Sequence, residues 1–69
     1  MNKTSAQKFG DNMKKIRLKI EMSQSDICRE SGLDPAYISN VENGKQNLTL
    51  STMEKIASVL DVSVDQLLK

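Results

Sequence analysis

Apolar residues recur at intervals of three or four along most of this chain, which is the spacing of one face of an α-helix. The first such run begins at Phe9 and predicts a helix with lysines on its outer face. Its inward positions are Phe9, Met13, Ile16 and Ile20. The preceding residues 1–8 are polar and lack the period, so they are predicted to form a loose N-terminal arm before a domain that spans residues 9–69.

The middle of the chain, SQSDICRESGLDPAYISNVENG from Ser23 to Gly44, predicts two short helices joined by a tight turn. Ser23 is a favourable N-cap, and Gly32 is suited to end the first helix in the left-handed region. Asp34 can cap the second helix, with Pro35 at its first position, where the missing N–H costs nothing. This arrangement is that of a helix-turn-helix.

The second of these helices has an unusual outer face. Ile38 and Val41 face inward, whereas the outward side chains are small and uncharged: Ala36, Ser39, Asn40 and Asn43. Amides, hydroxyls and a methyl group suit close contact with base edges, since Asn pairs with adenine and a methyl meets that of thymine. A solvated helix surface is the alternative interpretation.

Two further amphipathic runs follow, residues 53–60 and 64–68. The first has a capping-box spacing from Ser51 to Glu54, with Thr49 as an alternative cap, and the second has one from Ser63 to Gln66. The C-terminal end then carries more apolar side chains than one small core is expected to bury. We predict that they form a homodimer interface: Val62, Val64, Leu67 and Leu68.

Composition narrows the class of protein. A chain of 69 residues forms a single small domain, and association would help to stabilise it. The sequence has no His and one Cys, so no zinc site, disulfide or His-based nucleophilic pair is predicted. The net charge is only +1, so any basic footprint for nucleic acid must be local. No signal peptide or membrane span is recognisable, and a cytoplasmic protein is predicted.

The motifs resemble those of lambda repressor and Cro-like regulators, the Xre family. The matching segments are Arg17 in KKIRLKI, the Ser23-Gln24 pair, the Gly32-Leu33 turn, YISNVENGK and MEKIASVLDVSVDQLL. The resemblance implies an all-α, five-helix domain. Tyr37-Ile38-Ser39 and the NLTL segment after Gln46 are similar to segments of restriction–modification controller proteins. Glu21 departs from the pattern, because relatives commonly have a left-handed Gly there.

The resemblance also assigns roles to residues. It implies an ion pair between Arg17 and Glu42 that braces the first helix against the recognition helix. The candidates for reading bases are Ala36, Tyr37, Ser39 and Asn40. The candidates for binding phosphates are Ser23, Gln24, Asn43, Lys45, Gln46 and Asn47, and for Gln24 the N-terminal end of its helix adds attraction for an anion. Pro35 and Ala36 stand where many relatives carry long polar side chains, which favours readout of DNA shape.

The predicted function is that of a transcriptional regulator that binds double-stranded DNA as a homodimer on a roughly palindromic operator. No reaction, cofactor, metal or small-molecule ligand is expected. The alternatives are an antitoxin-like regulator that also binds a partner protein, and a helical protein-interaction module that does not bind DNA.

Overall fold

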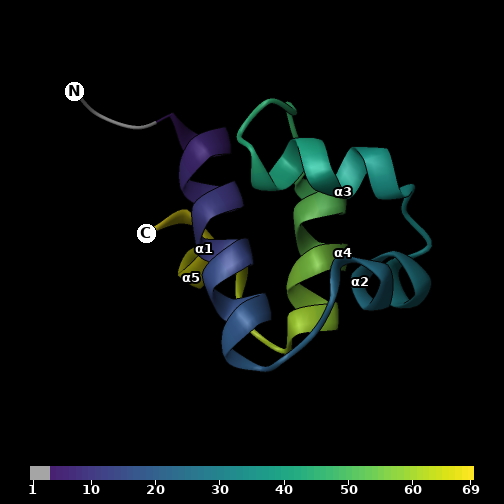
Figure 1. The fold of residues 1–69 in the computed structure, drawn as a ribbon. Helices are drawn as coiled ribbons and strands as arrows, with labels where there is room; N and C mark the ends of the chain where they lie inside the picture. The colour runs from purple at the N-terminus through teal and green to yellow at the C-terminus, as the bar shows by residue number, and fades with distance from the viewer. Residues whose placement is uncertain (1–3) are drawn as a thin grey trace.

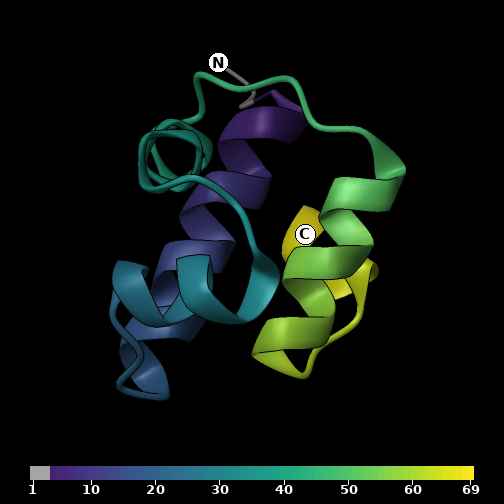
Figure 2. The same ribbon diagram turned by 90° about the vertical axis from the view of Figure 1, so that its right-hand side faces the viewer.

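The computed structural model describes residues 4–69, and every regular element in this range is a helix. In chain order the helices are α1 (Ser5–Lys19), α2 (Gln24–Ser31), α3 (Pro35–Glu42), α4 (Leu50–Leu60) and α5 (Val64–Leu68). α1 packs against α3 and α5, and α4 lies against α2 and α5 (Figures 1 and 2). The predicted all-α, five-helix architecture is confirmed.

α1 begins one turn before the start that the pattern from Phe9 predicts. Thr4 caps the helix in a capping box, in which its hydroxyl accepts from the N–H of Gln7 and the Gln7 side chain accepts from the N–H of Thr4. Residues 5–8 are therefore helical and do not belong to an arm, because a local cap compensates for their lack of apolar period. Residues 1–3 of the predicted arm lie outside the described residues.

The core is built from the inward faces of all five helices. Its buried members are Phe9, Met13, Ile27, Ile38, Val41, Ile56, Ala57, Leu60 and Leu67. Ile20 was expected on this inner face but is 45% exposed, because it is the C-cap of α1, where the chain turns away. Leu67 was expected at a dimer interface but is fully buried in the core, so it is not available to a partner.

The turn between α2 and α3 forms as predicted. Gly32 closes α2 with a φ of 74°, and its N–H donates to the Cys28 carbonyl. The Ser31 hydroxyl bonds to the Ile27 carbonyl and accepts from the N–H of Leu33, which returns the chain to the core. Asp34 then caps α3, whose first residue is Pro35. The predicted helix-turn-helix is confirmed by this geometry.

Hydrogen bonds between side chains and backbone identify the caps of the last two helices. The Thr49 hydroxyl accepts from the N–H of Thr52, so Thr49 caps α4 and Ser51 lies inside the helix. The predicted Ser51 capping box is therefore wrong, and the alternative cap is the one used. For α5 the predicted box of Ser63 with Gln66 is present.

Candidate nucleic-acid interface

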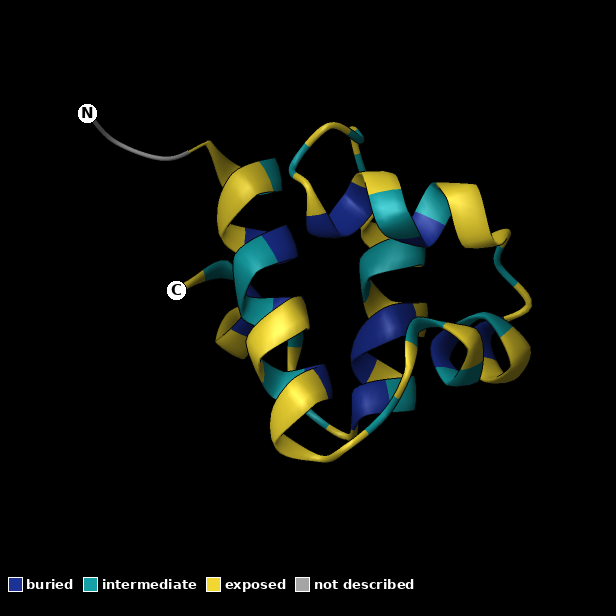
Figure 3. Cartoon of the chain, viewed as in Figure 1, coloured by how far each residue is buried: buried dark blue, intermediate teal, exposed yellow. Residues whose placement is uncertain are grey.

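The outer face of α3 carries the predicted base-reading residues. Ile38 and Val41 are buried against the core, and they hold the opposite side of the helix toward solvent. On that side Ala36 and Asn40 are exposed, while Tyr37 and Ser39 are half-buried. Figure 3 shows buried, half-buried and exposed stretches along the chain. Tyr37 packs partly against the core, which limits the reach of its hydroxyl. α3 thus presents small, uncharged groups at fixed positions.

The orientation of α3 is set by a buried fork between Arg17 of α1 and Glu42 at its end. The Nε of Arg17 donates to Glu42 Oε2 at 2.7 Å, and its Nη2 donates to Oε1 at 3.0 Å. The Glu42 side chain is 3% exposed, and hydrogen bonding to it raises the pKa of Arg17 despite the opposing effect of burial. Because two parallel bonds fix both distance and angle, the pair implied by the family resemblance locks α3 to α1.

The same pair also holds the N-terminal end of α2. Arg17 Nη1 donates to the carbonyl oxygen of Met22 at 2.9 Å, and the side-chain amide of Gln24 donates to Glu42 Oε1 at 3.0 Å. The partner of Gln24 was not predicted, because residues 24 and 42 are far apart in sequence and no local spacing pairs them. One carboxylate thus contacts both α1 and α2 from the end of α3.

Ser23 and Asp26 complete the capped end of α2. The Ser23 hydroxyl accepts from the N–H of Asp26, and the Asp26 carboxylate accepts from the N–H of Ser23. The pKa of Asp26 is lowered, chiefly by this bond from the Ser23 backbone. The Ser23 hydroxyl keeps its own hydrogen for donation, so the cap does not exhaust its bonding capacity.

The segment after α3 leaves the helix through a second left-handed glycine. Gly44 has a φ of 71°, and the N–H groups of Gly44 and Lys45 bond back to the carbonyls of Val41 and Asn40. Asn43, Lys45 and Asn47 are exposed and Gln46 is half-buried. The structure therefore places this predicted phosphate-binding group directly after the recognition helix.

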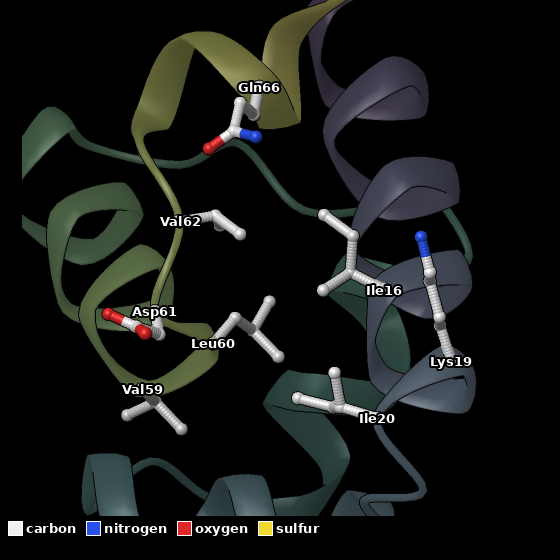
Figure 4. A pocket seen from close by; sticks show the side chains of 8 residues that line it. All are labelled: Ile16, Lys19, Ile20, Val59, Leu60, Asp61, Val62 and Gln66. Carbon is white, nitrogen blue, oxygen red and sulfur yellow. The ribbon is translucent and has the colours of Figure 1, made fainter.

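The residues predicted to form a dimer interface lie in and beside α5 and not on α3. Val62, Val64 and Leu68 are half-buried beside the core, and α5 packs against α1 and α4. Next to them is a pocket of about 440 Å³ that α1 and the α4–α5 junction enclose (Figure 4). It is lined by Ile16, Lys19, Ile20, Val59, Leu60, Asp61, Val62 and Gln66. This pocket was not predicted, because Ile20 fits the apolar period of the first helix and was expected to face the core.

The described part of the chain places no three His, Cys, Asp or Glu side chains together as a metal site requires. None of the helices in residues 4–69 has the length and apolar character to cross a membrane.

Comparison with known proteins identifies relatives along nearly the whole chain. Control protein C.MunI from Mycoplasma sp is 38% identical over 61 residues, which cover 87% of this chain and 82% of the relative. The restriction–modification controller protein C.AhdI from Aeromonas hydrophila superposes with a TM-score of 0.84 at 34% identity, covering 90% of this chain and 94% of that one. A second structure, the controller C.Esp1396I as a tetramer with its natural 35 base-pair operator, gives a TM-score of 0.82 at 34% identity and covers 99% of this chain and 100% of that one.

The helix-turn-helix family model matches residues 13–67, a range that includes every buried core residue except Phe9, the ion pair and both helices of the motif. The chain is therefore a member of the Xre-like helix-turn-helix family.

Proposed function

We propose that this protein is a transcriptional regulator that binds double-stranded DNA in a sequence-specific manner and is not an enzyme. The observation that carries the proposal is the outer face of α3, which is small, neutral and polar and is held in place by the Arg17–Glu42 fork. The aromatic ring on this face, that of Tyr37, is half-buried, so the face can approach base edges in the major groove closely. Family membership supports it, because controller relatives include one in complex with its operator.

Base reading is assigned to the exposed groups of α3. The amide of Asn40 suits the paired donor and acceptor of adenine, and the hydroxyl of Ser39 suits several bases. Ala36 offers a methyl group for thymine, and Tyr37 contributes its half-buried hydroxyl. Because none of these residues is an Arg or Lys that could reach deep into the groove, part of the sequence specificity is assigned to recognition of DNA shape.

Phosphate binding is assigned to the two segments that flank this face. At the N-terminal end of α2, the side chains of Ser23 and Gln24 are the assigned phosphate donors. The backbone N–H groups of the first turn and the positive end of the helix dipole add to the attraction for a phosphate. Beyond α3 the contacts fall to Asn43, Lys45, Gln46 and Asn47. These contacts fix the position of the protein on the duplex without reading sequence.

The proposal includes a homodimer in the cytoplasm. Because Leu67 is buried, the interface is assigned to Val62, Val64 and Leu68 together with the exposed Ile20 at the pocket. A two-fold dimer would place its recognition helices about 34 Å apart, one turn of B-DNA, and so require a roughly palindromic operator. The similarity to controller proteins over most of their length favours control of a restriction–modification system.

The test is selection of bound duplexes from a random pool at two salt concentrations, with wild type, Asn40→Ala and Gln24→Ala. We expect a palindrome whose binding weakens steeply with salt. Asn40→Ala should relax one position in each half-site, whereas Gln24→Ala should weaken all sites alike. If no duplex is enriched even at low salt, the chain is instead a protein-interaction module.

Sedimentation of Val62→Glu tests the dimer. Dimer formation would bury the new carboxylate without a partner, which is unfavourable, so this variant should be a folded monomer that binds a half-site weakly. Ser51→Glu, at an exposed position near the start of α4, is the control and should stay dimeric. A dimer that persists in Val62→Glu would contradict the assigned surface.

A further inference from the structure

The carboxylate of Glu42 makes more contacts than the ion pair with Arg17 requires. Its Oε1 accepts from Arg17 Nη2 and from Gln24 Nε2, each at 3.0 Å, and its Oε2 accepts from Arg17 Nε. A carboxylate has about four acceptor positions, so three hydrogen bonds leave it nearly saturated. With its side chain 3% exposed, Glu42 cannot exchange these partners for water.

Gln24 is held by this single contact. It is the first residue of α2 and half-buried, and the bond to Glu42 is the one hydrogen bond that its side chain makes within residues 4–69. An amide can rotate by half a turn and exchange its oxygen and nitrogen with little change in shape. A carboxylate accepts from N–H and repels the oxygen, so Glu42 selects the orientation in which nitrogen faces inward.

The consequence concerns the second hydrogen of the same nitrogen. Because the NH₂ group is planar, fixing one N–H on Glu42 also fixes the direction of the other, which has no acceptor in the described part of the chain. Arg17 adds to this by holding the Met22 carbonyl, so the backbone that leads into α2 is fixed as well.

We propose that Glu42 is a positioning residue for DNA binding, which holds the Gln24 amide so that its second N–H is presented to a phosphate. The inference rests on the proposed function. It gives the buried ion pair a role beyond stability, since the carboxylate that orients the base-reading helix also orients the phosphate contact. The two kinds of contact are therefore set by one group.

A double-mutant cycle separates this role from a structural one. The probe is the duplex enriched from the random pool, and affinity and melting temperature are measured for Glu42→Gln, Gln24→Ala and the double variant. Glu42→Gln replaces a charge-assisted bond with a neutral one, so we expect about five-fold weaker binding when Gln24 is present. With Ala at position 24, Glu42→Gln should weaken binding clearly less than it does with Gln, because only the orientation of α3 is then affected, while the melting temperature still falls through the weakened bond to Arg17.

The control is Ile56→Val, a core substitution in α4 that lowers stability without altering the network. It should leave the affinity unchanged when all proteins are assayed well below their melting temperatures. If Glu42→Gln weakens binding equally with Gln or Ala at position 24, Glu42 acts only as a structural residue and the inference is overturned. If wild type enriches no duplex, the proposed function fails, and the inference fails with it.

A measurement on the wild-type protein covers the case in which Glu42→Gln does not fold. The side-chain NH₂ of Gln24 should be rigid on the nanosecond timescale by NMR relaxation, compared with that of Gln46, whose side chain has no protein hydrogen bond among the described residues. Equal mobility of the two amides would overturn the inference without bearing on DNA binding.

Discussion

Gly10 of α1 lies so close to Val41 of α3 that a Cβ atom at residue 10 would be 2.2 Å from the Val41 carbonyl oxygen. That distance is far inside van der Waals contact, and the neighbour is backbone, which cannot rotate away. The absence of a side chain at Gly10 is therefore what allows α1 and α3 to cross at the level where Glu42 reaches Arg17.

Gly10→Ala should destabilise the protein strongly, although Ala is normally the better residue in a helix. We expect a loss of about 3 kcal/mol or more, because the helices must separate. Gly32→Ala is the control, since a Cβ there meets nothing within 4 Å and costs only the left-handed φ of 74°, about 1 to 2 kcal/mol. Urea unfolding measures both, and a smaller loss for Gly10→Ala than for Gly32→Ala would contradict the close crossing.

Asn12→Ala should loosen α5. The Asn12 amide donates to the Leu67 carbonyl at 2.9 Å, and this carbonyl belongs to the last turn of a helix, where no backbone donor remains. Its loss should cost about 1 to 2 kcal/mol and speed hydrogen exchange of the α5 amides more than those of α2. Asn47→Ala, at an exposed position, should change neither the stability nor the hydrogen exchange of α5. If Asn12→Ala speeds exchange equally in all helices, the bond does not hold α5 specifically.

Arg17→Ala and Glu42→Ala should each lower stability by about 3 to 5 kcal/mol, because each leaves a buried charge without its partner. Replacing both residues, as Arg17→Met with Glu42→Leu, should recover much of this loss, since no charge is then stranded. Thermal unfolding followed by circular dichroism measures the set. A double variant as unstable as the sum of the two single variants would contradict this account.

The parts of the fold that the sequence predicted are those with a local cause. Ser63 and Gln66 are three residues apart, and this spacing predicts the capping box that the structure has. Ser23 was predicted as the N-cap of α2, whereas its capping box with Asp26 was not predicted. The end of α2 at Gly32 was also predictable from a local cause, because glycine readily adopts the left-handed conformation found there. The start of α4 was ambiguous because two caps compete within one turn, and the bond to the Thr49 hydroxyl decides it.

The parts that were missed depend on how distant segments dock. Asn12 and Leu67 are 55 positions apart, and the direction in which Leu67 faces is set by how α5 lies on α1. On a helix of five residues, several apolar positions fit the same pattern, so burial of Leu67 could not be distinguished from exposure. For the same reason the family resemblance supplied the pair of Arg17 and Glu42, whereas the bond from Gln24 appeared only in three dimensions.

Acid should remove a contribution to stability that Asp26 makes near neutral pH. Its pKa in the folded state is lowered from the usual 3.8, chiefly by the Ser23 backbone N–H. A lowered folded-state pKa means that the contribution is complete above 3.8 and is lost as the pH falls through the lower value. Asp26→Asn should thus be less stable than wild type at about pH 7, and the difference should shrink as the pH falls below 3.8. A difference in urea unfolding that stays constant with pH would contradict this.

Glu21→Gly should stabilise the protein, because Glu21 occupies a conformation that suits glycine. Its φ is 60°, and the N–H groups of Glu21 and Met22 bond to the carbonyls of Leu18 and Arg17 in a Schellman closure of α1. Relieving the left-handed strain should contribute about 1 kcal/mol and raise the melting temperature by roughly 4 to 8 °C in a domain of this size. Glu21→Ala separates backbone from charge, since it removes the same carboxylate from the negative end of the α1 dipole but keeps a Cβ. If Ala raises the melting temperature as much as Gly does, the gain comes from removing the charge, and the left-handed turn at Glu21 carries no strain to relieve.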